Sequence, residues 1–398
     1  MKAKRVTFAE LAIKGILFFP IFTVIQAIPL FENINRIWLA LISVTLIVAL
    51  AEYRYTIAEF LMVVLTVILH VVALFFTNFP MEHVNMLFYF FLWVLLYMFF
   101  CKGKNQAMCI LRSSDRFINM ILTVWTVMVG MAACIPSNYK GSYFYPFNCS
   151  SFRLMPTVLV ISALAMYMSV KNEDKRYNLF LILPTYAAFM NSSRTYFAVY
   201  FVFLVMYIYM VFKSKKLFYA LLVPFALLVL FIMSLSGIAD KIASTTYVEG
   251  AYLGFWGTIT SGRSIFWKYD IEAFFDLPVW QQFVGNGFNF IYEVNARHFA
   301  RIWGHNDIIN IAMNFGYIGI IIYLWIFNKL LKSYHMRSRQ IPWLVKCTFL
   351  GAVFINSMMN MSYTYMCAMI SYALFLCVIE EKYHPKDLKV GIGNRNAL

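Results

Sequence analysis

The stretch WGHNDIINIAMNFGYIGIIIYLWIF (residues 303–327) passes from polar residues into an almost unbroken apolar run. Such a run is long enough to cross the roughly 30 Å hydrocarbon core of a membrane as a helix. Similar runs recur along the chain, in which 62% of the residues are hydrophobic and only 13% are charged. Backbone amides inside a bilayer must be satisfied within their own segment, so helices are the expected structure. The sequence therefore predicts an all-α, polytopic membrane protein.

The apolar runs predict about twelve transmembrane helices, which would make residues 1–398 a single integral membrane domain. The expected spans are 13–31, 36–51, 57–76, 84–100, 117–135, 154–170, 177–191, 194–212, 217–236, 306–328, 343–360 and 364–380. If both termini are cytoplasmic, all but nine of the 33 Lys and Arg lie on the cytoplasmic side, as the positive-inside rule requires. The basic loops then face anionic lipid headgroups, which argues against nucleic acid as the partner.

The longest polar connection covers residues 237–305 and lies on the extracytoplasmic side of this topology. Within it the sequence predicts two short helices, over about 262–276 and 288–303. Gly285 and Gly287 flank one asparagine, a pattern typical of a tight turn. A mostly apolar chain that keeps one long polar loop is expected to carry out its chemistry there.

Arg194 lies in NSSRTYF, between two apolar runs and at their extracytoplasmic end. A charge at such a position is costly near lipid and indicates function by default. A snorkelling interfacial arginine is the structural alternative. Ser193 and its polar neighbours add hydrogen-bonding groups at the same point, which favours the functional interpretation.

Arg263 follows Ser261 and Gly262 near the start of the first predicted loop helix, which Thr260 or Ser261 can cap. Free backbone amides at a helix start and a guanidinium group together bind anions well. The alternative is an arginine that is simply solvated in a loop.

His305 directly precedes the predicted span 306–328. An imidazole titrates near neutral pH and can take a proton from a hydroxyl group. Asn306 or Asp307 is expected to cap the helix that follows, and Asp307 is also a candidate to orient the imidazole. A capping or core histidine is the structural alternative.

Two arginines and one histidine from separate stretches are thus predicted on the same membrane face. Two guanidinium groups suit a diphosphate, which each can grip through paired hydrogen bonds, and a neutral imidazole suits activation of an incoming hydroxyl. The acids predicted on this face form no metal-binding motif, so we expect a reaction without metal or cofactor. Arg297, Arg301, Gly285 and Gly287 are candidate supporting residues.

Four motifs resemble those of the bacterial O-antigen polymerase and ligase superfamily, which contains Wzy-type polymerases and WaaL-type ligases. They are SSRTYF (192–197), SGRSIFW (261–267), VGNGF (284–288) and GHNDIINIAMNFGYIG (304–319). The resemblance implies a C-type glycosyltransferase architecture, a metal-independent reaction and donors linked to undecaprenyl diphosphate. Carried over to this chain, it implies that Arg194 and Arg263 hold the diphosphate and that His305 activates the acceptor hydroxyl.

A single His305 after Gly304, with His298 seven residues earlier, favours a polymerase within this superfamily. Such an enzyme of the bacterial inner membrane would extend O-antigen, capsule or exopolysaccharide by moving the growing glycan onto the non-reducing end of a lipid-linked repeat unit. A chain-length regulator is a candidate partner.

Four other functions are alternatives. One is a non-enzymatic structural partner in a polysaccharide assembly complex, which the two arginines and the histidine disfavour. Of the other three, the first is a ligase that transfers glycan to lipid A-core. The second is a polysaccharide transporter or flippase, which the lack of repeat symmetry in the sequence disfavours. The third is a transferase with a monophosphate lipid donor, disfavoured because the first outer loop holds Glu32 alone.

Overall fold

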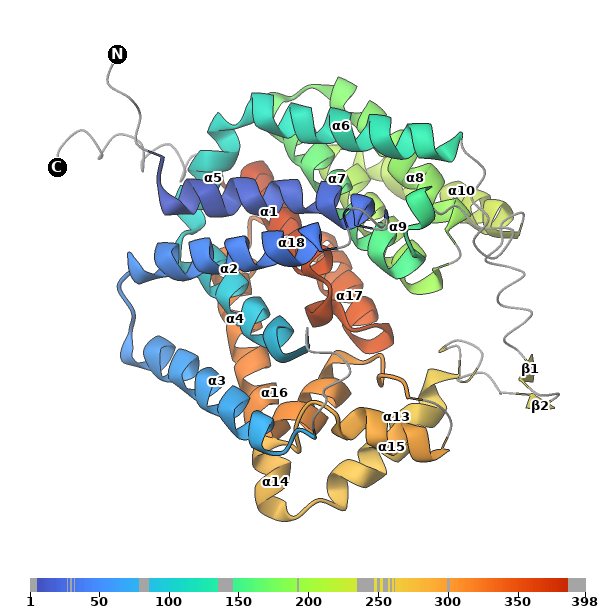
Figure 1. Cartoon of the computed structure of the whole chain (residues 1–398). Helices are drawn as coiled ribbons and strands as arrows, with labels where there is room; N and C mark the ends of the chain where they lie inside the picture. The colour runs from blue at the N-terminus through green and yellow to red at the C-terminus, as the bar shows by residue number, and fades with distance from the viewer. Residues whose placement is uncertain are drawn as a thin grey trace.

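The computed structural model describes residues 6–385, except 27, 29–30, 32, 79–85, 135–145, 192, 235–246, 249–250, 253–256, 258–259, 261 and 299–300. The described regular structure is helical apart from a small antiparallel ribbon of β1 (Tyr247–Val248) and β2 (Ala251–Tyr252). Figure 1 shows the helices gathered around a central pair, α7 and α18. The prediction of an all-α architecture is confirmed at this level.

The helices follow one another along the chain with short connections. The first group is α1 (Phe8–Ile25), α2 (Ile34–Ala51), α3 (Ile57–Phe75), α4 (Met86–Lys102), α5 (Lys104–Ser113), α6 (Asp115–Ala133), η2 (Pro146–Asn148), α7 (Ser151–Asn172), η3 (Lys175–Leu181), α8 (Ile182–Met190), α9 (Arg194–Val211) and α10 (Lys215–Ser234). The second is α13 (Arg263–Phe275), α14 (Val279–Val284), α15 (Phe290–His298), α16 (Asp307–Ser333), α17 (Trp343–Met359), η4 (Ser362–Thr364) and α18 (Met366–Tyr383).

Seven of the described helices, namely α1, α2, α3, α6, α7, α9 and α16, are long and apolar enough to cross a membrane. The α4–α5 pair, bent by 82°, makes eight if it counts as one span. This is consistent with a polytopic membrane protein, and among the described residues it does not confirm the twelve expected spans. The expected span 177–191 is not one helix, because η3 occupies its first residues and α8 has only nine.

Apolar side chains on the outside of α2 and α3 point away from the rest of the protein. Ile57 and Phe75 are 81% and 82% exposed, and only 22% of each of these two helices is buried. A continuous apolar surface of this kind is rare on a water-soluble monomer. It fits contact with lipid.

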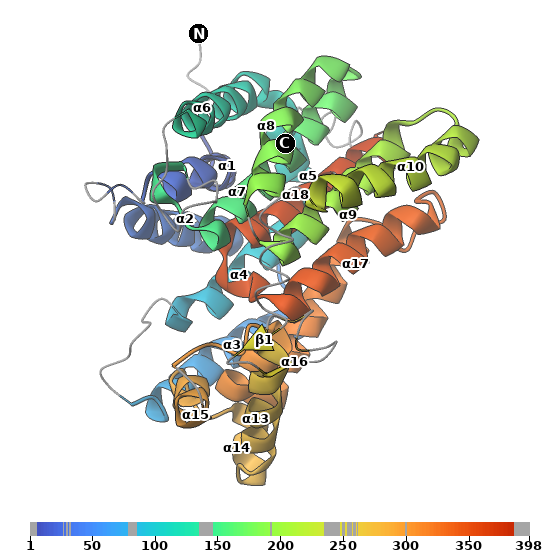
Figure 2. The same cartoon turned by 90° about the vertical axis from the view of Figure 1, so that its right-hand side faces the viewer.

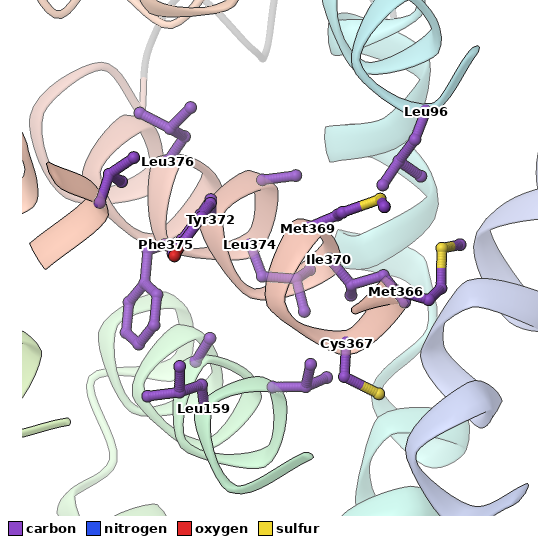
Figure 3. Packing of buried hydrophobic residues seen from close by; sticks show 14 of the residues in the cluster. Leu96, Leu159, Met366, Cys367, Met369, Ile370, Tyr372, Leu374, Phe375 and Leu376 are labelled. Carbon is purple, nitrogen blue, oxygen red and sulfur yellow. The ribbon is translucent and has the colours of Figure 1, made fainter. Parts of the chain in front are cut away.

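The centre of the core is α18, which is buried on every side from Met366 to Glu381. Figure 3 shows Leu159 of α7 and Leu96 of α4 packed around it. Phe203 of α9 stacks on Phe375 of α18 with ring centroids 3.7 Å apart. A helix enclosed in this way reads as apolar all round, without an amphipathic stripe.

Figures 1 and 2 both place α13, α14 and α15 together at one end of the molecule, beside α3 and α16. The first predicted loop helix, over 262–276, corresponds closely to α13. The second, over about 288–303, overlaps α15 but is too long, because residues 301–303 are not helical; residues 299–300 lie outside the described residues. The sequence also did not predict α14 between them. Part of the predicted loop 237–305, chiefly its first ten residues, lies outside the described residues.

Two glycines dock α14 onto α16. A Cβ atom at Gly285 would lie 2.3 Å from the backbone of Asn314, and one at Gly316 would lie 2.3 Å from the backbone of Phe283. Both glycines have positive φ angles, 82° and 66°, and α16 is broken at Gly316. Only glycine permits this approach of two backbones. The motifs VGNGF and NFGYIG therefore form one packing joint between α14 and α16, the helix that His305 precedes.

Buried ion pairs cluster at the opposite end of the bundle, where α3 begins and α4, α16 and α18 end. Three buried carboxylates have cationic partners there: Glu59 with Lys102 and Lys329, Glu380 with Lys104, and Glu381 with Arg112. This is the end that the sequence predicts to be cytoplasmic.

Candidate functional site

Arg194 is the first residue of α9 and is half-buried. Ser193 is the helix N-cap, although its side chain makes no capping hydrogen bond. Tyr196, two residues later, is buried, and its hydroxyl has no hydrogen-bond partner among the described residues. The guanidinium group thus lies at a membrane-helix start that offers further polar groups.

Arg263 is the first residue of α13 and follows Gly262, whose φ is 81°. Thr260, one of the two predicted caps, accepts a hydrogen bond from the backbone N–H of Ser264 at 3.1 Å; Ser261, the other, lies outside the described residues. Burial, with a smaller contribution from the charge of Arg194, lowers the pKa of Arg263 to about 10. The guanidinium therefore remains charged at neutral pH in poorly hydrated surroundings.

His305 connects α15 to α16 with a φ of 49°. Such a left-handed conformation is uncommon for residues other than glycine and is often found at functional sites. Its Nδ1 is buried without a hydrogen-bond partner among the described residues. Burial and, to a smaller extent, the charge of Arg263 lower its pKa to about 3. The imidazole is therefore neutral at neutral pH.

Arg194, Arg263 and His305 come from separate elements yet interact electrostatically. The charge of Arg263 acts on His305, and the charge of Arg194 acts on Arg263. Charges perturb each other strongly only at short range and with little water between them. The fold therefore places Arg263 within electrostatic range of both Arg194 and His305, while the individual roles of the three residues remain predictions.

Asn306 confirms the expected cap of α16. Its side-chain oxygen accepts a hydrogen bond from the backbone N–H of Ile309 at 3.2 Å. Its amide nitrogen donates to the carbonyl of Met358 in α17 at 3.2 Å. Asn306 thus fixes the backbone that carries His305 against a second helix.

Asp307 faces the bundle interior. Its carboxylate accepts hydrogen bonds from the hydroxyls of Tyr323, at 3.0 Å, and Ser362. The backbone N–H of Tyr363 lies 3.4 Å from the second oxygen. These contacts tie the His305 segment to η4, the short helix that leads into α18. Asp307 therefore positions backbone, and no described hydrogen bond joins it to the imidazole.

The other predicted supporting residues lie farther out. Arg297 and Arg301 are exposed, at the end of α15 and just beyond it. Neither is among the groups that shift the pKa of Arg263 or His305. Gly285 forms the joint with α16, and a Cβ at Gly287 would lie 2.9 Å from the backbone of α3. The two glycines therefore serve packing.

Asp270 is a residue that the sequence interpretation left among the unpaired acids. It is fully buried, and a Cβ at Gly304 would lie 2.8 Å from its Oδ2. Neither carboxylate oxygen has a well-formed hydrogen bond among the described residues. Burial raises its pKa to about 7. Asp270 follows Arg263 by seven residues, and this spacing of two helical turns could have indicated a shared face.

Two tyrosines also border Arg263 and were not predicted. The hydroxyls of Tyr196 and Tyr365 both interact electrostatically with the guanidinium. In the sequence, these tyrosines are typical of the aromatic residues found at the ends of membrane helices. Their spacing does not indicate that both lie near Arg263.

No group of three or more His, Cys, Asp or Glu side chains is placed to hold a metal ion in the part of the chain that the structure describes. Comparison with protein-family models found no match, and comparison with curated proteins found no significant similarity.

Proposed function

We propose that this protein is a glycosyltransferase of the bacterial inner membrane that polymerises a polysaccharide. It moves a growing glycan from undecaprenyl diphosphate onto a hydroxyl at the non-reducing end of a lipid-linked repeat unit. The observation that carries this proposal is the electrostatic coupling of Arg194, Arg263 and His305 at the start of three elements. The resemblance to O-antigen polymerases and ligases supports the same assignment.

In the proposed reaction the acceptor hydroxyl oxygen attacks the anomeric carbon of the donor glycan. The bond between that carbon and the diphosphate oxygen breaks, and the lipid diphosphate leaves with the electron pair. Arg194 and Arg263 stabilise the charge that develops on the leaving group, a form of catalysis that needs preorganised donors. His305 receives the proton of the hydroxyl.

The low pKa of His305 couples this proton transfer to donor binding. With the site empty, an imidazole with a pKa of about 3 is a weak base. A bound diphosphate places negative charge beside Arg263 and His305, and a nearby opposite charge raises the pKa of a histidine. His305 therefore becomes an effective base only when the donor is in place.

The proposal includes a topology of about twelve spans with both termini in the cytoplasm and the 237–305 loop outside. The buried ion pairs at the far end of the bundle fit a cytoplasmic location there. Membrane lipid surrounds the spans, a chain-length regulator is a candidate partner, and no metal or cofactor takes part.

A deletion strain complemented with variants tests this function. Arg263→Ala and His305→Ala should each abolish long-chain ladders on gels of surface polysaccharide, while the amount of membrane-inserted protein stays the same. Arg339→Ala, an exposed arginine between α16 and α17, is the matched control and should leave the ladder unchanged. Normal ladders in both site variants would contradict the proposal. Free polymer that forms in the deletion strain but does not reach lipid A would identify a ligase instead.

A further inference from the structure

A second group of arginines lines a cavity of about 160 Å³ near the candidate site. The cavity lies where α1 ends and where α2, α4, α7 and α18 begin. Its polar lining includes Gln26, Asn35, Arg36, Tyr89, Arg153 and Tyr365. It therefore opens at the same end of the bundle as Arg194 and His305.

The cavity is positively charged. Arg36 and Arg153 lie in the first turns of α2 and α7, where the unpaired amides of a helix start add to the positive potential. Neither arginine forms an ion pair among the described residues; Glu32 lies outside them. Both act electrostatically on Tyr89, which places the two guanidinium groups on the same lining residue.

Neutral hydrogen-bonding groups complete the lining. The side-chain amide of Asn35 donates to Oε1 of Gln26 at 3.0 Å. The Oδ1 atom of Asn35 is buried and has no partner among the described residues. A buried acceptor without a partner costs free energy unless a ligand or water satisfies it.

Tyr365 links this cavity to the candidate site. It lines the cavity and interacts electrostatically with both Arg153 and Arg263. Each of the two groups of arginines thus has a member within electrostatic range of Tyr365. This arrangement suits a reaction in which two phosphate-bearing substrates must be held side by side.

The size of the cavity limits what can enter it. Its volume of about 160 Å³ has room for a compact group such as a phosphate. Leu39 and the half-exposed Phe152 provide apolar lining at the cavity rim. A lipid phosphate with its tail in the membrane fits these features better than a sugar chain does.

We propose that Arg36 and Arg153 bind a phosphate of the second lipid-linked substrate, the acceptor. This inference rests on the proposed function, in which Arg194 and Arg263 hold the diphosphate of the donor. A polymerase has two polyprenyl diphosphates bound at the moment of transfer, and a separate arginine pair for each keeps both reacting ends in reach of His305. Phospholipid headgroups share this phosphate chemistry and are the competing occupant.

Binding stoichiometry tests the inference with the full-length protein in phosphatidylcholine nanodiscs and undecaprenyl diphosphate as the probe. Native mass spectrometry should show two bound equivalents for the wild type and one for Arg36→Ala/Arg153→Ala. The matched control, Arg54→Ala/Arg339→Ala, removes two exposed arginines from connections at the other end of α2 and after α16 and should still bind two. Two equivalents in Arg36→Ala/Arg153→Ala would overturn the inference.

A second arm separates the two phosphate sources. In nanodiscs that contain phosphatidylglycerol, the wild type should still bind two equivalents of undecaprenyl diphosphate. If phosphatidylglycerol displaces the undecaprenyl diphosphate whose binding depends on Arg36 and Arg153, the cavity binds phospholipid. That result would overturn the proposed acceptor site.

Kinetics distinguish failure of this inference from failure of the proposed function. Arg36→Ala/Arg153→Ala should raise the KM for the acceptor by at least about tenfold, because hydrogen bonds to charged groups are lost, and leave the KM for the donor unchanged. Arg36→Lys/Arg153→Lys should recover part of the loss. If Arg36→Ala/Arg153→Ala leaves the acceptor KM unchanged while His305→Ala is inactive, the acceptor site is rejected and the proposed function stands. If His305→Ala is active while Arg36→Ala/Arg153→Ala loses one bound equivalent, the proposed function is rejected and the second binding site stands.

Discussion

The two ends of the helical bundle differ in whether their charged side chains form ion pairs. At the end predicted to be cytoplasmic, the buried carboxylates of Glu59, Glu380 and Glu381 all have cationic partners. At the other end, Arg36, Arg153 and Arg263 have no carboxylate partner among the described residues. Paired charges hold helices together, whereas arginines without an acid keep their potential available to an anion. We call the first end the structural end and, in line with the proposed function, the second the ligand-binding end.

The largest expected effect on stability comes from breaking a pair at the structural end. Glu59→Gln leaves Lys102 and Lys329 beside an uncharged amide at a site where the glutamate side chain is 2% exposed. Loss of one partner of a buried ion pair costs about 3–5 kcal/mol. The thermal midpoint in detergent or nanodiscs should fall clearly. Glu52→Gln, at an exposed position just after α2, is the control and should not change it.

A smaller loss is expected at the joint between α14 and α16, the helix that His305 precedes. Gly316→Ala places a Cβ 2.3 Å from the backbone of Phe283 in a left-handed conformation. The strain and the forced separation of α14 from α16 should cost about 2–4 kcal/mol and should also lower transfer activity by moving His305. Gly351→Ala in α17 has open space around the new methyl group. If both variants unfold at the same temperature, the proposed joint is wrong.

The smallest expected effect is a pH dependence in which two groups oppose each other. The pKa of Asp270 rises from 3.8 to about 7, so the folded state keeps a proton that the unfolded state releases. Stability from this group therefore falls as the pH rises from about 4 to 7. The pKa of His305 falls from 6.5 to about 3, so its contribution to stability grows as the pH rises from about 3 to 6.5.

Single variants should separate these two contributions. Asp270→Asn should leave a thermal midpoint that rises between about pH 4 and 6.5, and His305→Ala should leave one that falls over a similar range. Thermal unfolding at several pH values measures both slopes. Slopes of the same sign in the two variants would contradict the burial of one of the two groups.

Much of the helical framework could be predicted because long apolar runs mark membrane helices directly. The expected span 57–76 corresponds to α3 and 154–170 lies within α7. The expected span 177–191 is not a single helix, because a 3-10 helix changes to an α-helix at Ile182. The apolar residues of this stretch give no sign of that change. The short α14 was missed because its position depends on the glycine joint with α16, a contact distant in sequence.

The candidate site could be predicted only where local sequence marks a polar residue. Arg194 and His305 stand out because they border apolar runs, and Arg263 because it stands at a predicted helix start in the polar loop. Tyr365 and the Arg36–Arg153 pair did not, because their importance comes from helices that meet only in the folded bundle. Sequence spacing carries information along one helix, as for Asp270, but not between helices.

The most direct measurement compares donor binding and glycan transfer in the same purified samples of wild type, Arg263→Ala and His305→Ala. The probe is an undecaprenyl-diphosphate-linked oligosaccharide, with a lipid-linked repeat unit as acceptor. We expect Arg263→Ala to bind the donor weakly and His305→Ala to bind it normally, with no polymer formed by either. Polymer made by His305→Ala, or wild-type donor affinity in Arg263→Ala, would contradict the central claim.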